Sequence, residues 1–470
     1  MGERRTKIVA TVGPATRETE ALRALIGAGV DVFRLNFSHG TAPEHVAVIR
    51  AIRSLEAELG VEVGILQDLC GPKIRLGLLP GRGVELEPGG TVRLVPGQEA
   101  PAGALPVGYP RLLEDVRPGD PILLADGAVE LRVRGVRDGA LEAEVVTGGR
   151  VSSHKGVNLP ESRLRVPAVT AKDRSDLEAG IEAGVDFVAL SFVREPADVR
   201  PVLERLEGLP RRPLVIAKIE KPEAVRRLDG ILAAVDGVMV ARGDLGVEMP
   251  AEEVPMIQKR IIGAARSAGK PVITATQMLR SMVDAPRPTR AETSDVANAI
   301  LDGTDAVMLS EETAVGRYPV EAVRVLDRIA RAVEPELRWE AHLEEPLAPE
   351  LPVPAGAISR AACWLARDVE AGLIVASTTG GSTARLVARF RAPFPVIGLS
   401  PHAAVRRQLR LSWGVVPAAM EPVAGTDVLF ERVREAARAR GVAPGTRIVV
   451  TAGLPLNVPG TTNLVHVLEV

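Results

Sequence analysis

The sequence has few cysteines and few aromatic residues. Only two cysteines occur among 470 residues, Cys70 and Cys363, and aromatic residues make up 3% of the chain. Two cysteines so far apart in sequence give no disulfide framework of the secreted type, so we expect a protein of the reducing cytoplasm. No uncharged apolar run reaches 18 residues, and the charged N-terminus lacks a signal-peptide core. We therefore predict neither export nor a membrane partner.

The chain also lacks an excess of charge of either sign. Its 58 Lys and Arg residues nearly balance its 60 Asp and Glu residues, and the formal net charge is -2. This balance gives no general attraction for polyanions, so we predict no nucleic-acid partner. A hydrophobic content of 46% and this length are typical of a globular protein of several domains. Any affinity for anions must then come from local sites.

What the sequence does contain is a repeated alternation of short apolar runs with amphipathic segments of helical period. This alternation indicates parallel βα units. Eight runs carry the pattern: Ile8–Val12, Val32–Phe37, Val63–Leu69, Phe187–Phe192, Leu214–Ile219, Val238–Ala241, Val272–Ala275 and Ala306–Leu309. We predict an α/β fold built on a (β/α)₈ barrel, with a doubly wound open sheet as the alternative.

Two regions depart from the barrel pattern. Between 71 and 166 the sequence is rich in glycine and proline with short β-branched runs, which predicts a small inserted β domain. Because it follows the third strand at the predicted catalytic face, this insertion could be a lid, although a merely decorative role is the alternative. We expect the barrel to comprise 1–70 and 167–343, followed by a proline-rich linker at 344–354 and a C-terminal α/β domain at 355–470.

Polar side chains interrupt the predicted barrel strands near their carboxyl ends. In the second strand Arg34, Asn36 and Ser38 share one face by the period of two. The fifth strand ends with Lys218 and Glu220, whose burial would be costly unless they pair with each other or bind a metal and an anion.

The sixth and seventh strands add further polar groups at the same edge. Asp244 follows the sixth strand beside small residues such as Gly243, and Thr276 follows the seventh. Two carboxylates with free coordination positions suit Mg²⁺. Three cations, Arg34, Arg75 and Lys218, could neutralise a phosphoryl group, so the set favours phosphoryl transfer.

Several motifs resemble those of the pyruvate kinase family across the whole chain. They are Arg34-Leu35-Asn36-Phe37-Ser38-His39-Gly40, Gly71-Pro72 to Arg75, Lys155-Gly156-Val157-Asn158-Leu159-Pro160, Lys218-Ile219-Glu220, the run from Met239 to Asp244, Ala275-Thr276-Gln277-Met278-Leu279, Pro286 to Glu292 and Ser294 to Ala299. The resemblance implies transfer of the phosphoryl group of phosphoenolpyruvate to ADP in glycolysis, giving pyruvate and ATP, by a homotetramer.

The resemblance also implies a role for each matching position. Lys218 would stabilise the transition state, and Thr276 would help to orient the proton donor to the enolate. Phosphoenolpyruvate would contact Arg34, Gly243, Asp244 and Thr276. Mg²⁺, for which Mn²⁺ could substitute, would be held by Glu220 and Asp244, and the nucleotide phosphates by Arg75 and Lys155.

Two other functions remain open from the sequence. One is a barrel enzyme that binds Mg²⁺ and a pyruvate enolate, such as a phosphoenolpyruvate mutase or a pyruvate-dependent aldolase. The other is an inactive metabolite sensor that keeps the C-terminal domain. The insertion with Lys155 favours a nucleotide substrate, and the intact Lys218, Glu220 and Asp244 argue against an inactive protein.

A glycine-containing loop in the C-terminal domain predicts an effector site. The loop Ser377 to Thr383 follows a predicted strand and opens a helix, an arrangement whose amides and hydroxyls suit an anion. Its candidate ligands are Thr378, Thr379, Gly380, Gly381, Ser382 and Thr383, together with the loop from Leu454 to Thr462. We expect a phosphorylated activator, a sugar monophosphate or AMP; a plain turn capped by Ser382 is the alternative.

The family resemblance also implies a monovalent-cation site, but one position departs from it. Asn36, Ser38, Asp68 and the Leu69 carbonyl match the K⁺ ligands of many relatives. Where K⁺-dependent members carry a glutamate, this chain has Lys73. Because an ammonium repels a nearby cation, we predict that K⁺ is not required. Alternatively, Lys73 points to solvent and K⁺ still binds.

Overall fold

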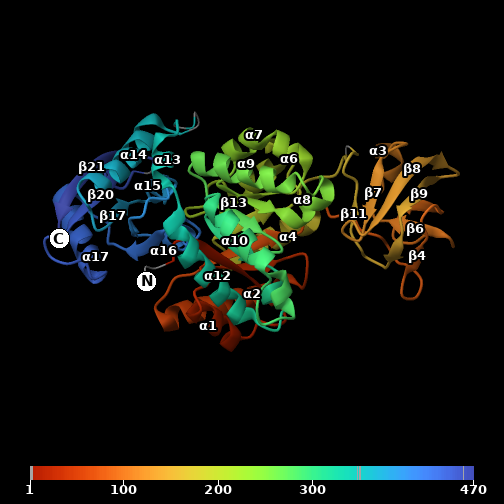
Figure 1. Ribbon diagram of the computed structural model, residues 1–470, viewed down its shortest axis with the longest axis horizontal. Coiled ribbons are helices and arrows are strands. Elements are labelled where there is room, and N and C mark those ends of the chain that lie inside the picture. Colours follow the sequence, from red (N-terminus) through yellow and green to blue (C-terminus); the bar gives the residue numbers. More distant parts are fainter. Residues whose placement is uncertain (1–3, 163, 347, 349–350, 459) are drawn as a thin grey trace.

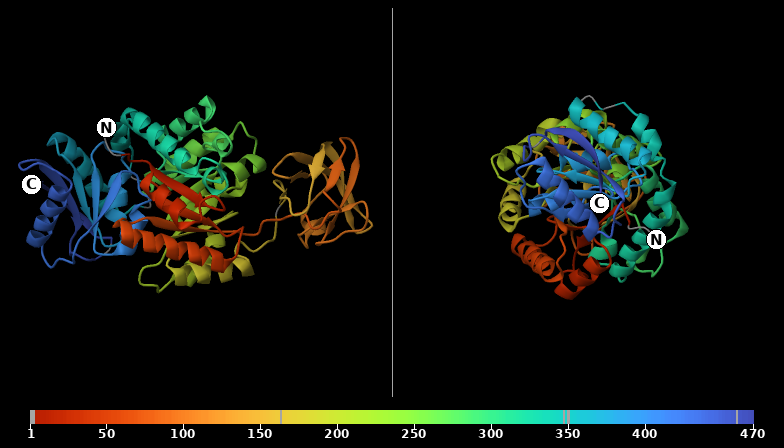
Figure 2. Two further views of the ribbon diagram at one scale, coloured as in Figure 1. Left: turned by 90° about the horizontal axis from the view of Figure 1, so that it is seen from below. Right: turned by 90° about the vertical axis from the view of Figure 1, so that its left-hand side faces the viewer.

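The computed structural model describes residues 4–162, 164–346, 348, 351–458 and 460–470. Three bodies follow one another along its longest axis (Figure 1). A helix-covered barrel lies in the middle, with a small β-rich body at one end and the C-terminal body at the other, and a second view keeps this order (Figure 2). Among the described residues, no helix is long and apolar enough to cross a membrane.

The central body is a closed parallel barrel, which confirms the predicted barrel and excludes the open sheet. Its strands pair in the order β1-β16-β15-β14-β13-β12-β3-β2. They are β1 (Lys7–Val12), β2 (Val32–Asn36), β3 (Gly64–Leu69), β12 (Phe187–Leu190), β13 (Leu214–Ile219), β14 (Gly237–Ala241), β15 (Val272–Ala275) and β16 (Ala306–Leu309). Closure comes from β1 beside β16, where Lys7 is in register with Ala306.

The barrel strands are buried on both faces, as parallel strands covered by helices must be. Val9, Leu66 and Ile216 lie in a cluster inside the barrel, whereas Phe33 and Leu35 pack outward in a core shared with the helices. Those helices are α1 (Thr19–Gly27), α2 (Ala42–Leu59), α4 (Ala171–Ala183), α5 (Pro196–Leu206), α6 (Pro222–Arg226), α7 (Leu228–Ala234), α8 (Arg242–Glu248), α9 (Val254–Ser267), α10 (Arg290–Leu301), α11 (Glu311–Ala314), α12 (Pro319–Val333) and α13 (Trp339–Glu344). Two 3₁₀ turns, η1 (Arg280–Val283) and η2 (Glu334–Glu336), complete the layer.

Local sequence sets the helix ends. Helix α2 begins after Thr41, which forms a capping box with Glu44, and ends at Gly60, whose φ of 64° suits glycine. Helix α9 begins at Val254, directly after residues that form a turn.

The inserted body is a separate curled sheet with its own core. Its main sheet has the order β11-β7-β8-β9-β5-β6, and β4 pairs with β10 beside it. The elements are β4 (Val84–Leu86), β5 (Thr91–Pro96), β6 (Ala104–Val107), α3 (Leu112–Asp115), β7 (Pro121–Leu124), β8 (Val129–Arg137), β9 (Ala140–Thr147), β10 (Gly149–Val151) and β11 (Val157–Asn158). Leu94, Leu105 and Leu131 are buried at its centre. It is inserted between β3 and α4, so it projects from the carboxyl ends of the barrel strands (Figure 1).

The C-terminal body is a five-stranded α/β unit with the sheet order β19-β18-β17-β20-β21. Its elements are α14 (Val353–Asp368), β17 (Ile374–Ser377), α15 (Ser382–Ala388), β18 (Val396–Ser400), α16 (Ala403–Leu409), β19 (Val415–Ala419), α17 (Thr426–Ala439), β20 (Arg447–Gly453) and β21 (Thr462–Glu469). It contacts the amino ends of the barrel strands: Lys7 Nζ donates to the Val415 carbonyl at 2.8 Å. Within the expected linker 344–354, residues 347 and 349–350 lie outside the described part of the chain.

Candidate active site

A buried group of alternating charges occupies the carboxyl ends of β2, β3 and β13. Arg34 Nε donates to Asp68 Oδ2 at 2.7 Å. Lys218 Nζ lies 3.4 Å from Asp68 Oδ1 and 2.9 Å from Glu220 Oε1. Arg34 and Lys218 are each 9% exposed, and the two carboxylates are almost fully buried. The structure therefore brings Arg34, Lys218 and Glu220 together at the mouth of the barrel, and it places Asp68, expected as a K⁺ ligand, among them.

The electrostatics of the group keep Lys218 charged. Burial by itself would lower the pKa of Lys218, but the charge of Asp68, followed by that of Glu220, holds the pKa above its ordinary value. The ammonium also donates to Ser191 Oγ at 2.7 Å. Lys218 is thus a fixed cation at the bottom of the mouth.

Glu220 is a buried carboxylate whose charge the ammonium of Lys218 compensates only in part. It is completely buried, and burial raises its pKa even though Lys218 opposes the shift. The Phe192 N–H donates to its Oε2 at 2.6 Å, but among the described residues its buried Oε1 accepts no well-formed hydrogen bond. A divalent cation at this oxygen would offset the cost of burying the charge.

Asp244 supplies a second carboxylate from the first turn of α8, and its side chain is 28% exposed. Among the described residues no cluster of three or more potential metal ligands occurs. Two carboxylates with an open side suit Mg²⁺, which keeps several coordination positions for water and substrate oxygens. The donor set of Glu220 and Asp244 therefore fits the metal that the sequence predicted.

The loops after β14 and β15 meet through Thr276. The Gly243 N–H donates to Thr276 Oγ1 at 2.8 Å. Thr276 has a φ of 68°, an unusual conformation for a β-branched residue and one that is typical of functional sites. Arg242 fixes the same loop by donating to the Thr276 carbonyl at 2.7 Å and to Asp295 at 2.6 Å.

Arg75 and Lys155 lie together where the inserted body joins the barrel. Arg75 forms an isolated bridge with Gly156, and its Nη1 donates to the His154 carbonyl at 3.0 Å. Lys155 is exposed beside it. Both cations therefore lie on the segments that connect the insertion to the barrel, and these segments would change conformation if the insertion moved.

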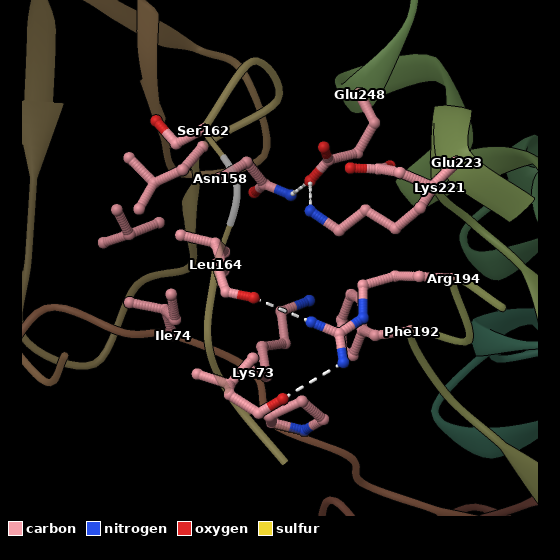
Figure 3. Close-up of a pocket in the computed structure, with 14 residues that line it drawn as sticks. Lys73, Ile74, Asn158, Ser162, Leu164, Phe192, Arg194, Lys221, Glu223 and Glu248 are labelled. Atoms are coloured by element: carbon pink, nitrogen blue, oxygen red, sulfur yellow. Dashed lines mark hydrogen bonds and ion pairs between the residues drawn. The ribbon is translucent and has the colours of Figure 1, made fainter. Parts of the chain in front are cut away.

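A cavity between the inserted body and the barrel is crossed by a polar contact (Figure 3). Asn158 Nδ2 of β11 donates to Glu248 Oε1 of α8 at 2.7 Å, and Lys221 Nζ donates to the same oxygen at 2.6 Å. Nearby, Arg194 donates to the carbonyls of Leu164 and Val166 at 2.9 and 3.1 Å. These bonds tie the insertion to the barrel beside the mouth.

Three of the positions expected to bind K⁺, Asn36, Asp68 and Leu69, already use an oxygen in a contact with another protein group. Asn36 Oδ1 accepts from the Ser38 N–H at 3.2 Å, and the Leu69 carbonyl accepts from Ser191 Oγ at 2.9 Å. Asp68 pairs with Arg34 as described above.

Lys73, whose charge motivated the prediction about K⁺, pairs with another carboxylate. Its ammonium lies 3.4 Å from Asp244 Oδ1. The sequence did not predict this pairing with a candidate Mg²⁺ ligand.

The predicted effector loop lines a cavity in the C-terminal body. Gly381 has a φ of 84°, and its N–H donates to Thr378 Oγ1 at 2.8 Å. Thr383 Oγ1 lies 2.7 Å from Thr462 Oγ1, so the cavity brings the loop together with residues beyond β20. The described lining residues offer hydroxyls and amides but no lysine or arginine. Residue 459 of the second loop lies outside the described residues.

Sequence reasoning missed several groups that contact the site. Ser191 and the Phe192 N–H bind Lys218 and Glu220, and Glu248 links the insertion to the barrel. The polar Ser191 at the end of an apolar run was a usable signal. No feature of the local sequence marks the Phe192 amide as a hydrogen-bond donor to Glu220.

Comparisons with known proteins agree with this geometry. A family model described as "Pyruvate kinase, barrel domain" matches residues 3–323, and one described as "Pyruvate kinase, alpha/beta domain" matches 356–468. A pyruvate kinase of Agrobacterium vitis is 46% identical over 99% of this chain and 98% of its own length, and one of Corynebacterium glutamicum is 46% identical over 99% and 97%. A crystal structure of a pyruvate kinase from Cryptosporidium parvum superposes with a TM-score of 0.92 at 34% identity, covering 99% of this chain and 96% of that one.

Proposed function

Because the chain belongs to the pyruvate kinase family and is a phosphotransferase of that family, we propose that its barrel mouth transfers the phosphoryl group of phosphoenolpyruvate to ADP with Lys218 as the central catalytic residue. The observation that carries this proposal is the buried ammonium of Lys218 between Asp68 and Glu220. A cation fixed in advance stabilises charge that develops on transfer without reorganisation.

We propose that phosphoenolpyruvate lies against Arg34, the Gly243 amide region, Asp244 and Thr276. Arg34 is oriented by Asp68 and by Thr11 Oγ1, which it approaches at 3.0 Å, so its guanidinium is preset for a phosphoryl group. Gly243 suits close approach of a substrate to the backbone because it has no side chain, and its N–H donates to Thr276 Oγ1, which fixes the loop. Thr276 would orient the proton donor to the enolate.

Glu220 and Asp244 would hold Mg²⁺, which when bound neutralises negative charge on phosphoryl and enolate oxygens. The buried, raised-pKa carboxyl of Glu220 supports this assignment. Arg75 and Lys155 would bind the nucleotide phosphates, and their place on the connection to the insertion supports a role for that body as a lid. We take 71–166 as the lid, 1–70 and 167–343 as the catalytic barrel, and 355–470 as a regulatory domain.

We further propose that K⁺ is not required. The ammonium of Lys73, close to Asp244, already supplies a positive charge at the mouth. Resemblance to the family supports a cytoplasmic homotetramer, which light scattering of the purified protein would test.

For the C-terminal loop of Thr378 to Thr383 we propose a sugar monophosphate or AMP as activator, because its cavity offers hydroxyl and amide groups. Ser382→Asp would place a carboxylate at the proposed phosphate position and should abolish activation by all such compounds. Ser54→Asp, which puts a carboxylate on the exposed face of α2 in the barrel, should leave activation intact. Unchanged activation of the Ser382 variant would refute the site.

The decisive test of the activity is an assay that follows pyruvate release from phosphoenolpyruvate with Mg²⁺, with and without ADP. Release should depend strictly on ADP and form ATP in equal amount. Turnover of phosphoenolpyruvate without ADP would instead favour a mutase or an aldolase, and no turnover at all would favour a sensor.

A further inference from the structure

Glu248, the last residue of α8, receives hydrogen bonds from two other parts of the molecule (Figure 3). Its Oε1 accepts one bond of 2.6 Å from Lys221 Nζ of the barrel and one of 2.7 Å from Asn158 Nδ2 of the insertion. The Glu248 side chain is fully buried, and among the described residues its Oε2 has no hydrogen-bond partner. Lys221 and Asn158 are therefore the groups that compensate this buried charge, and the loss of either should be costly.

The bond from Lys221 connects the two proposed Mg²⁺ ligands. Lys221 directly follows Glu220 in the chain, so a bond that fixes its side chain also restrains the backbone that carries Glu220. Glu248 comes four residues after Asp244, about one turn further along the same helix. The ion pair between Lys221 and Glu248 therefore ties the end of β13, with one ligand, to α8, with the other.

The bond from Asn158 adds the insertion to this connection. Asn158 is buried in β11, and the insertion also approaches α8 at Gly127, where a Cβ would lie 3.8 Å from Val247. Near the start of the helix Lys73, on the first segment that leads into the insertion, lies 3.4 Å from Asp244. Residues of the insertion thus contact α8 near both of its ends.

We propose that Glu248 is a positioning residue through which contact with the insertion sets the geometry of the two Mg²⁺ ligands. Mg²⁺ demands near-ideal octahedral geometry, so it binds well only where its protein ligands are held at the right spacing. Groups that orient metal ligands without touching the ion contribute strongly to metal affinity. Glu248 would act in this way, through Lys221 and α8. The inference rests on the roles proposed above for Glu220, Asp244 and the insertion.

Such a coupling is reciprocal, because it is a free energy shared by two binding events. The bond between Asn158 and Glu248 holds α8 in the position that suits the cation. A cation held by Glu220 and Asp244 in turn keeps α8 where Asn158 can reach Glu248. The cation would therefore favour the docked insertion, and the docked insertion would raise the affinity for the cation.

Binding of Mn²⁺ to the full-length protein without nucleotide, followed by the EPR signal of the free ion, tests the coupling. Glu248→Asp keeps the charge but shortens the side chain by one methylene, so it should raise the Kd for Mn²⁺ about tenfold or more. Asn158→Ala changes no charge and should raise this Kd about threefold or more. Because Asn158 acts through Glu248, the double variant should bind Mn²⁺ no more weakly than Glu248→Asp alone.

Two matched variants control for effects unrelated to the coupling. Glu178→Asp shortens a carboxylate that pairs with Arg205 on the outside of the barrel, and Ser162→Ala removes a bond within the insertion. Neither should change the Kd for Mn²⁺. A Glu248→Asp protein with a lower Tm but an unchanged Kd would show that Glu248 has a purely structural role, and it would overturn the proposal.

The same measurement separates this inference from the function on which it rests. If Asp244→Asn leaves the Kd for Mn²⁺ unchanged, the metal assignment fails and the coupling fails with it. If Asp244→Asn weakens binding but Glu248→Asp and Asn158→Ala do not, the coupling alone fails. Additive effects in the double variant would also overturn it, because the two residues would then act on the cation independently. Should Glu248→Asp fail to fold, the comparison of Asn158→Ala with Ser162→Ala decides.

Discussion

Lys218 is held by three side chains at once, Asp68, Glu220 and Ser191, so its ammonium cannot move far from the place where charge would develop. Because the ammonium of Lys218 is fixed there, its removal should lower kcat more than it raises the KM for either substrate. The sequence placed Lys218, Glu220 and Arg34 at one edge because strand period and strand ends are local properties. It could not place the contacts of Lys218 with Asp68 and Ser191, because these depend on the order in which the strands close.

We expect Lys218→Met to lower kcat by about 100-fold or more, because it keeps the apolar stem and removes the stabilising cation. Steady-state kinetics with both substrates saturating measure the effect. Lys259→Met, on the exposed face of α9, is the matched control and should retain full activity. A Lys218 variant within tenfold of the wild type would reject the catalytic role.

Lys73 gives a second prediction at this scale. Activity in tetramethylammonium buffer should equal that in potassium buffer at the same ionic strength. Lys73→Glu should lose this independence, because a carboxylate beside Asp244 would attract a monovalent cation. A tenfold or larger stimulation of the wild type by K⁺ would contradict the prediction.

At the scale of elements, the apolar runs predicted the barrel strands to within about two residues because such strands are buried on both faces. The largest difference is β12, which was expected to reach Phe192 but ends at Leu190. Phe192 leaves the sheet with a φ of 57°, a turn that directs its amide to Glu220. The shortest strands of the insertion, such as β11, were not predicted, because two residues carry no period.

The contact between β11 and α8 leads to a prediction about the lid. Asn158→Asp replaces the donor to Glu248 with a like charge, which should weaken the contact between the insertion and the barrel by about 1–2 kcal/mol. We therefore expect the KM for ADP to rise by about 5- to 30-fold with little change in kcat.

Ser162→Ala is the matched control for this change, because it removes a bond of 2.7 Å to Asp120 that stays within the insertion. Its KM for ADP should remain that of the wild type. Equal effects of the two substitutions would mean that Asn158 matters only for the stability of the inserted body.

At the scale of the whole molecule, the contact between β1 and the C-terminal body includes a lysine in an unfavourable place. Burial, despite the opposing charge of Asp31, lowers the pKa of Lys7 from 10.5 to about 8. Its ammonium lies 3.9 Å from Asp31 and donates to the Val415 carbonyl. Below pH 8 Lys7 is charged in the folded protein, and its burial then lowers the free energy of unfolding.

The sign of the resulting pH dependence follows from proton binding. Between about pH 8 and 10.5 the unfolded chain holds a proton on Lys7 that the folded protein has released, so this group favours folding more as pH rises. The full difference is about 3 kcal/mol at 1.36 kcal/mol per pKa unit.

Lys7→Met removes this pH-dependent contribution to the free energy of unfolding. The Tm of the variant minus that of the wild type should therefore decrease steadily from pH 7.5 to pH 10. Arg432→Met should show no such trend, since its exposed side chain on α17 takes no part in the contact between β1 and the C-terminal body. A constant difference for Lys7→Met across that range would show that Lys7 keeps an ordinary pKa.

The closing pair of the barrel also has a consequence for biosynthesis. Lys7 on β1 pairs with Ala306 on β16, so the first strand must wait for about 300 residues to be translated before its second neighbour exists. The inserted sheet, by contrast, takes all its strands from one continuous stretch between β4 and β11 and has its own core. On the ribosome it can fold while the barrel around it is still open, since domains fold as units in the order of synthesis. An incomplete barrel that exposes the open edge of its first strand is then the stage at which wrong strand pairing threatens this chain most.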